Sequence, residues 1–331
     1  MSDAKRSDGP GVAAAVGDPR RLSSRQRTAA MTAAILDVMH LGFVGFGLIG
    51  GSIARAIRAS ADGSSWTISA WSPTGAGPAR AAEDGTIDRA APSAAGAIGD
   101  ADLVVLAGPP TACLTALDDL VGSSHESLPP DAVITDVAST KGAILARADA
   151  AGLRFVGGHP MAGLEVSGYE AGRADLFVGR PWVIVPGRVA SPADVGLVRA
   201  MAEACGARPL ELDAAVHDRA VAAISHLPLL LAAALVETVA GTTADGAPNT
   251  WSIAAGLAAS GWRDMTRLAR GDPSMGAGIA ATNAEAIGDQ LRALEATLAS
   301  WREELERPGG PDEPSIRERL AITRARLEEG T

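Results

Sequence analysis

A histidine in a glycine-rich segment is the residue of this sequence that points most directly to chemistry. His159 lies in GGHPMAG (residues 157–163), directly after an apolar stretch that predicts a strand. A histidine can accept a hydrogen bond from a substrate hydroxyl and take up its proton near neutral pH. We therefore predict that His159 is a catalytic base; a histidine that is only packed in the structure is the alternative.

Two further polar side chains follow the preceding predicted strand. The segment DVASTK (residues 136–141) places Ser139 and Lys141 just after it. Because the carboxyl ends of neighbouring parallel strands meet at one edge of a sheet, we expect Ser139, Lys141 and His159 to share one crevice. A serine hydroxyl there can orient a nicotinamide ring, and a lysine can bind an anionic substrate.

A glycine motif precedes these residues. GFGLIG (residues 45–50) follows an apolar predicted strand and precedes a helical stretch, a context typical of a dinucleotide-binding turn. The first glycine makes the turn, the second lets the backbone approach the pyrophosphate, and the third lets the helix pack on the strand. The predicted cofactor-binding residues of this motif are Gly45, Phe46, Gly47, Leu48, Ile49 and Gly50.

The end of the second predicted strand bears on the choice between NAD and NADP. An acidic residue there would bind the ribose 2′-hydroxyl of NAD, but this chain reads AWSP (residues 70–73). Ser72 and Thr74 can hydrogen-bond a 2′-phosphate, although the first following arginine is Arg80. The pattern slightly favours NADP but does not decide between NADP and NAD. Pro109, after the next strand, either lines the nicotinamide ribose or belongs to an ordinary turn.

The hydrophobic pattern predicts an α/β, Rossmann-type, doubly wound parallel sheet. The predicted strands are Leu41–Val44, Trp66–Trp71, Leu103–Ala107, Val133–Asp136, Arg154–Gly157 and Trp182–Val185. No strand is expected after Pro186, where long helices over 217–240, 253–270 and 283–306 predict an all-helical domain. In the last helix, apolar residues from Ile287 to Leu305 recur at steps of four and three. These residues form an apolar seam along the helix, which is explained either by burial within one chain or by a contact between subunits.

Four parts of the chain follow from these patterns. We expect a disordered extension over 1–38, a dinucleotide-binding domain over 39–187, a helical domain over 188–306, and a linker with a short terminal helix over 307–331. Ser315 and Glu318 form a capping box that would begin the terminal helix. The arginine-rich start can alternatively be a transit peptide or reflect a start codon placed upstream of Met39.

Composition excludes several classes of partner. The formal charge of −10 argues against a general nucleic-acid surface. Cys113 and Cys205 are far apart, which predicts neither a disulfide framework nor a metal site and suggests a reducing cytoplasm. The longest apolar run, Leu227–Val236, is expected to be broken at Pro228, so no membrane partner is predicted.

Six segments, in this order along the chain, resemble those of prephenate and arogenate dehydrogenases. Together they extend over roughly residues 41 to 306. The segments are GFGLIGGS (45–52), DVASTK (136–141), GGHPMAGLEVSG (157–168), His217 with Asp218, SHLP (225–228) and WRDMTRLA (262–269).

The resemblance implies NAD(P)-dependent oxidative decarboxylation of prephenate to 4-hydroxyphenylpyruvate by a homodimer formed through the helical domain. Hydride leaves C4 for the nicotinamide, the C4 hydroxyl becomes a carbonyl, and the ring carboxylate departs as carbon dioxide. By resemblance His159 polarises the C4 hydroxyl, Ser139 supports both this histidine and the nicotinamide, and Arg267 binds a carboxylate of the dicarboxylate substrate. His226 either contributes to the pocket or packs within its helix.

One departure from the family leaves the substrate open. Where the family commonly reads SHLPH, this chain has Leu229 in place of the last histidine. Arogenate and 4-amino-4-deoxyprephenate are therefore alternative substrates. Two other classes of protein are alternatives. One is a hydroxyacid-type dehydrogenase, which would use a lysine that the helix over 217–240 lacks. The other is an NAD(P)-binding sensor without catalysis.

Overall fold

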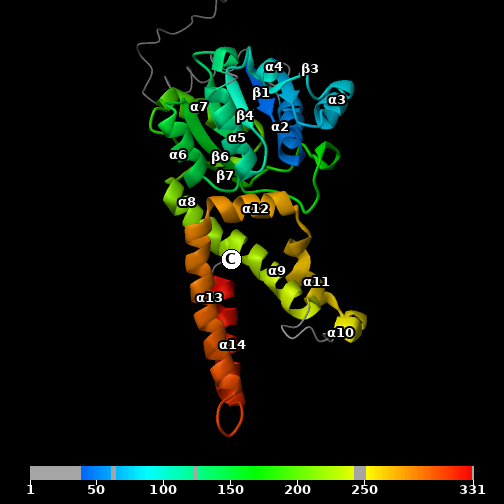
Figure 1. The fold of residues 1–331 in the computed structure, drawn as a ribbon, viewed down its shortest axis with the longest axis vertical. Helices are drawn as coiled ribbons and strands as arrows, with labels where there is room; N and C mark the ends of the chain where they lie inside the picture. The colour runs from blue at the N-terminus through cyan, green and yellow to red at the C-terminus, as the bar shows by residue number, and fades with distance from the viewer. Residues whose placement is uncertain (1–38, 61–64, 123–124, 242–250, 330–331) are drawn as a thin grey trace, which may run out of the picture.

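The computed structural model describes residues 39–60, 65–122, 125–241 and 251–329 of the chain. A sheet with helices on both faces forms one part, and a group of helices lies beside it (Figure 1). The predicted extension over residues 1–38 lies outside the described residues.

The sheet has eight strands in the order β3-β2-β1-β4-β5-β6-β7-β8. The first six in this order are parallel, β7 is antiparallel to β6, and β8 runs parallel to β7. The strands are β1 (His40–Val44), β2 (Thr67–Trp71), β3 (Arg89–Ala90), β4 (Leu103–Leu106), β5 (Val133–Asp136), β6 (Phe155–Pro160), β7 (Pro181–Pro186) and β8 (Arg208–Glu211). This confirms the predicted doubly wound fold. The order reverses between β1 and β4, where such sheets bind ligands at their carboxyl ends.

Three features of the sheet differ from the sequence prediction. The expectation that strands end at Pro186 is wrong, because β8 pairs with β7 beyond residue 187. Its four residues, RPLE, lie at the sheet edge with mostly exposed side chains, so no apolar run signals them. β3 has only two residues and was also missed. β6 ends three residues later than predicted, at Pro160 instead of Gly157, because its end pairs with β7, with His159 opposite Val183.

Helices bury both faces of the sheet. They are α2 (Leu48–Ala59), α3 (Ala76–Glu83), α4 (Ala94–Ile98), α5 (Pro110–Val121), α6 (Gly142–Ala150) and α7 (Pro192–Ala204), with short turns η2 (His125–Ser127) and η3 (Tyr169–Ala171). In β4, Leu103 and Val105 belong to one apolar cluster, whereas Val104 and Leu106 belong to the cluster on the opposite face. Because successive side chains of a strand point to opposite faces, this is the pattern of a sheet covered on both sides.

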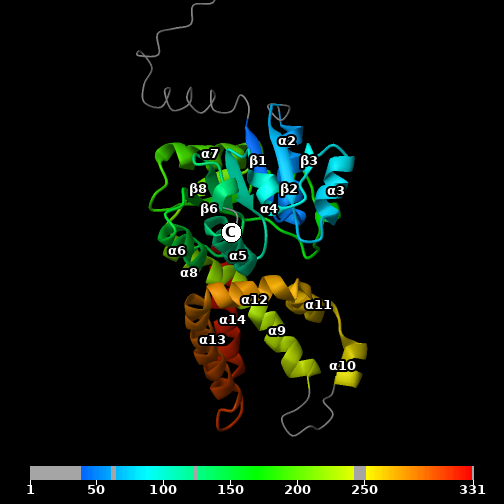
Figure 2. The same ribbon diagram turned by 45° about the horizontal axis from the view of Figure 1, so that its top comes forward.

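All described elements after β8 are helical, as predicted. They are α8 (Ala214–Val221), η4 (Ala222–His226), α9 (Leu227–Ala240), α10 (Trp251–Leu257), α11 (Ser260–Thr266), η5 (Arg267–Arg270), α12 (Pro273–Thr282), α13 (Ala284–Leu305) and α14 (Glu313–Glu329). α8 packs on α6 and α12 packs on α5, while α13 and α14 extend away from the sheet (Figures 1 and 2). The terminal helix is 17 residues long and begins before Ser315, so the predicted capping box is wrong.

The expected break at Pro228 is absent from the structure. Residues Ala214–Ala240 form one run of 27 helical residues. Its middle segment η4 is a π-helix, and the Leu227 amide donates to the carbonyl of Ala222, five residues back. A proline ring inside a helix clashes with the carbonyl four residues back, and the wider π turn just before Pro228 relieves this crowding.

This 27-residue helix is long and apolar enough to cross a membrane, and its most apolar stretch of 18 residues has a mean hydropathy of 1.9. Only 22% of its most apolar stretch is buried within the chain. Most other residues of this stretch are half-buried or exposed in the described part of the protein. Length and composition alone do not distinguish a lipid environment from a second protein surface.

Candidate active site

A cavity of about 680 Å³ lies at the carboxyl ends of β1, β2 and β4. Of the predicted cofactor-binding residues, those that line it are Gly45, Phe46, Gly47, Ser72 and Pro109. Leu48, Ile49 and Gly50 form the first turn of α2, outside this lining. The predicted glycine motif and the predicted ribose-binding strand end therefore meet in one cavity.

The glycine turn fits a dinucleotide pyrophosphate. Gly45 has a φ of +85°, and a Cβ at this position would lie 2.9 Å from the backbone of Ala107. A Cβ at Gly47 would meet no atom within 4 Å, so the space beside this glycine is open. No side chain caps the start of α2, which leaves its first amides available to an anion.

The segment between β6 and β7 forms a wall of the same cavity. Tyr169 stacks on Phe46 with ring centroids 5.7 Å apart, and a Cβ at Gly51 would lie 2.6 Å from the tyrosine ring. Arg80 also lines the cavity, and its Nε lies 3.3 Å from a carboxylate oxygen of Glu170. The sequence analysis missed Tyr169 and Glu170, since neither belongs to a motif.

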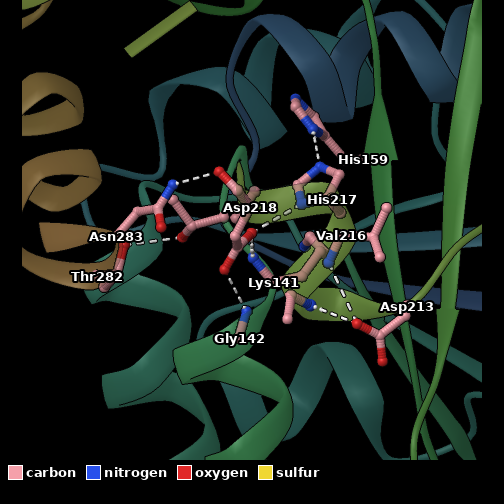
Figure 3. A network of polar contacts seen from close by, with 12 residues as sticks. Lys141, Gly142, His159, Asp213, Val216, His217, Asp218, Thr282 and Asn283 are labelled. Carbon is pink, nitrogen blue, oxygen red and sulfur yellow. Dashed lines mark hydrogen bonds and ion pairs between the residues drawn. The ribbon is translucent and has the colours of Figure 1, made fainter. Parts of the chain in front are cut away.

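His159 is bonded to a second histidine. Its Nδ1 lies 2.8 Å from Nε2 of His217, and Nδ1 of His217 lies 2.8 Å from Asp218 (Figure 3). The sequence analysis had expected Ser139 to support His159. Among the described residues the buried Oγ of Ser139 has no hydrogen-bond partner, and it is His217 that contacts His159.

The carboxylate of Asp218, a residue of α8, is bound by backbone amides at the start of α6. Its two carboxylate oxygens accept hydrogen bonds of 2.8 Å from the backbone amides of Lys141 and Gly142. Burial raises the pKa of Asp218, but the hydrogen bonds from His217 and these amides outweigh burial and hold the pKa below its usual value. Asp218 is therefore ionised at neutral pH.

Lys141 does not reach the crevice as predicted. Its side chain is 1% exposed and its ammonium pairs with the fully buried carboxylate of Asp136. Asp136 also accepts a 3.0 Å hydrogen bond from the Gly158 amide, one residue before His159. The lysine stem passes over β6, where a Cβ at Gly157 would lie 3.1 Å from it. This position does not support a role of Lys141 in substrate binding; the pair ties the end of β5 to β6.

His226 belongs to the same buried cluster. Asn283 donates to the carbonyl of Asp218 at 2.9 Å, and its side-chain nitrogen lies 3.1 Å from Nδ1 of His226. The buried Nε2 of His226 lacks a hydrogen-bond partner within the described chain. Burial lowers the pKa of His226 to about 4, so its ring is neutral at physiological pH.

Arg267 reaches from the helical domain to the segment that follows His159. It lies in η5, and its guanidinium forms an ion pair with Glu165. The arginine side chain is 56% exposed. An incoming carboxylate would therefore compete with Glu165, a residue that the sequence analysis did not single out, for this guanidinium.

The environment of His159 favours its neutral form. Burial is the largest cause that lowers its pKa well below the usual value, and His217, Lys141 and His226 lower it further. A neutral imidazole can accept a proton.

No group of three or more potential metal ligands was found among the described residues, and both cysteines are buried and unpaired. The cytoplasmic location stays a prediction.

Comparison with known proteins decides the family. The family model described as "Prephenate dehydrogenase, nucleotide-binding domain" matches residues 53–211, and "Prephenate dehydrogenase, dimerization domain" matches 213–321. The chain belongs to the prephenate dehydrogenase family. It is 32% identical to prephenate dehydrogenase of Bacillus subtilis over 75% of its own length and 65% of the relative's, so the match spans just under two thirds of that protein.

Two solved structures of this family are similar over most of the chain. Arogenate dehydrogenase of Synechocystis is 30% identical, with a TM-score of 0.71 over 88% of this chain and 100% of that one. Prephenate dehydrogenase of Aquifex aeolicus, in complex with hydroxyphenyl propionate and NAD+, is 27% identical, with a TM-score of 0.76 over 88% and 98% of the two chains.

The buried pair of Lys141 and Asp136 gives a stability prediction. Lys141→Met keeps the length of the side chain but leaves the Asp136 carboxylate buried without its cation. We expect the free energy of unfolding to fall by about 3 kcal/mol or more in urea denaturation. The matched control is Arg317→Met, which removes an exposed ion pair with Glu313 and should change stability far less. Equal losses in the two variants would contradict the structural role of the buried pair.

Proposed function

We propose that this protein catalyses the NAD(P)-dependent oxidative decarboxylation of prephenate to 4-hydroxyphenylpyruvate. The observation that carries the proposal is a neutral His159 near the carboxyl end of β6, at the same edge of the parallel strands as the cavity, in a chain of this family. Membership in the family and the named activities of its relatives support it.

The residues of this chain suit that reaction in distinct ways. A bound nicotinamide would supply a hydride acceptor. His159 takes the proton of the C4 hydroxyl as the carbonyl forms, and it remains in contact with His217 while it carries the charge. The unpartnered hydroxyl of Ser139 is available to the substrate hydroxyl or the carboxamide. Arg267 is the cation on the helical domain that suits a planar carboxylate.

Arogenate is the second candidate substrate. Leu229 replaces a polar residue of the family, and it packs in an apolar cluster with Ala222, Ile279 and Ile287. It therefore cannot hydrogen-bond the part of the substrate that a histidine would meet. The similarity to the Synechocystis arogenate dehydrogenase supports arogenate, and 4-amino-4-deoxyprephenate remains a third candidate.

We also propose a homodimer formed through the helical domain. The name of the matching family model supports it, as do large apolar side chains on that domain. Ile224, Ile253 and Leu257 are at least 70% exposed, and the outer part of the α13 seam is open at Leu298 and Leu305. A second copy of the chain would cover the surface that the long helix leaves exposed.

For the cofactor we propose a preference for NADP. No carboxylate follows β2, whereas Ser72, Thr74 and Arg80 all line the cavity. Arg80 is in the second turn of α3, the helix that follows β2, and a guanidinium there can pair with a 2′-phosphate. Glu170 and Glu83 hold it in its present position.

Initial rates with prephenate and arogenate, each with NAD and NADP, test the activity. We expect reduced cofactor with prephenate, and we expect His159→Asn to lower kcat by at least about 100-fold because the base is lost. The variant should bind the cofactor nearly as the wild type does. Retained turnover would contradict the role of His159, and no reduced cofactor with either substrate would favour a sensor.

The pKa of His159 predicts the pH dependence. Activity needs the neutral imidazole, so kcat/KM should be constant near neutral pH and fall as His159 is protonated. Because burial and the neighbouring basic groups lower this pKa, the acid limb should have its midpoint well below pH 6.5. A midpoint at or above 6.5 in the wild type would show that His159 is not the neutral, buried base described above.

Arg80 is the residue that tests the cofactor preference. Arg80→Gln should raise the KM for NADP by roughly tenfold, since a charge-assisted bond is worth about 1.5–3 kcal/mol, and leave the KM for NAD within about twofold. Arg147→Gln, which removes an exposed pair with Asp118 outside the cavity, is the matched control. A wild type that prefers NAD would refute the proposed preference.

A further inference from the structure

The function as proposed so far gives Asp218 no part and uses His217 only as a contact of His159, yet both residues are hydrogen-bonded in line with that histidine. Asp218, His217 and His159 form a continuous chain of hydrogen bonds, each 2.8 Å long. Both His217 and Asp218 are buried. The second nitrogen of His159 points away from His217 (Figure 3).

The order of donors and acceptors along this chain sets the position of each proton. The Asp218 carboxylate can only accept, and its oxygens also accept from two backbone amides, so Nδ1 of His217 must be the donor. Nε2 of His217 then carries no proton and accepts from Nδ1 of His159. A neutral His159 with its proton on Nδ1 has a free lone pair on Nε2.

We propose that His217 and Asp218 are positioning residues that fix His159 in the tautomer whose Nε2 is free to accept the substrate proton. The proposal rests on the proposed function for its catalytic consequence, but the tautomer itself is a property of the protein alone. A buried carboxylate that orients a histidine is a known way to set which ring nitrogen acts as the base. Here a second imidazole lies between the two.

Among the residues that the structure describes, the neighbouring elements supply no competing hydrogen-bond partner for Nδ1 of His159. Lys141 precedes α6, and its ammonium is paired with Asp136 of β5. His226 in η4 has its Nδ1 against Asn283, which lies between α12 and α13. Both residues, with His217, face His159 closely enough to influence its charge. Of these groups, His217 is the one that bonds the ring.

Two substitutions of His217 separate positioning from packing. His217→Leu fills the buried site without an acceptor, whereas His217→Gln offers an amide oxygen that can accept from Nδ1 of His159. We expect the leucine variant to lower kcat by about 100-fold with the KM for substrate within about twofold, and the glutamine variant to recover at least about tenfold of that loss. The control is His40→Leu, which removes a histidine of β1 that is hydrogen-bonded to Ser69 of β2; this variant should retain kcat.

The role of Asp218 is tested against a second aspartate, Asp213, which caps the start of the same helix, α8. Asp218→Ala should lower kcat by at least about tenfold, because His217 is then free to adopt the other tautomer. Asp213→Ala removes the side chain that caps the start of α8, so it should lower the Tm but leave kcat within about twofold. Equal kcat in the two variants would show that Asp218 acts only through the stability of α8.

The tautomer can be read without turnover. The chain has five histidines, so ¹⁵N-labelled histidine and single-site variants allow each ring to be assigned by NMR. In the wild type we expect the His159 proton on Nδ1, and in His217→Leu a mixture of both tautomers or the Nε2 form. A wild-type ring protonated on Nε2, or a tautomer unchanged by His217→Leu, overturns the proposal. If the tautomer switches as expected but no cyclohexadienol is turned over, the proposed function fails while the positioning stands.

Discussion

The site around His159 depends on two buried carboxylates that bind the segment between β5 and the start of α6. Asp136, at the end of β5, holds the Lys141 ammonium and the amide that precedes His159. Asp218, from the helical domain, accepts from the amides of Lys141 and Gly142 at the start of α6. A buried carboxylate is stable only where donors surround it, so each of them fixes several backbone positions at once.

The two parts of the protein consequently form one site. The sheet domain supplies His159, Ser139 and the nucleotide cavity, whereas the helical domain supplies His217, Asp218 and His226. Contacts of α8 with α6 and of α12 with α5 bring these groups together. Figure 3 shows the result, with residues from β6, α8 and the end of α12 in one network. Neither domain alone contains the bonded histidine pair.

Burial has the same effect on two histidines near the site, His159 and His226. It lowers the pKa of both His159 and His226, which keeps the rings neutral in a region that also contains a buried ammonium. Neutral rings can accept protons and hydrogen bonds, whereas charged ones could only donate. The charges of the cluster are instead carried by groups with fixed partners, namely Asp136 with Lys141 and Asp218 with backbone amides.

The sequence by itself determined the class of fold, the glycine turn and the importance of His159, because strand periodicity, glycine spacing and turn chemistry are local properties. It also indicated that β5 and β6 would end side by side. The tertiary structure alone decided that His217 bonds His159, that Lys141 is buried against Asp136, that β8 completes the sheet, and that a π turn carries the helix past Pro228. The reason is physical: a hydrogen bond between residues 58 positions apart, or the burial of a charge, depends on how two domains pack, and no local pattern records that packing.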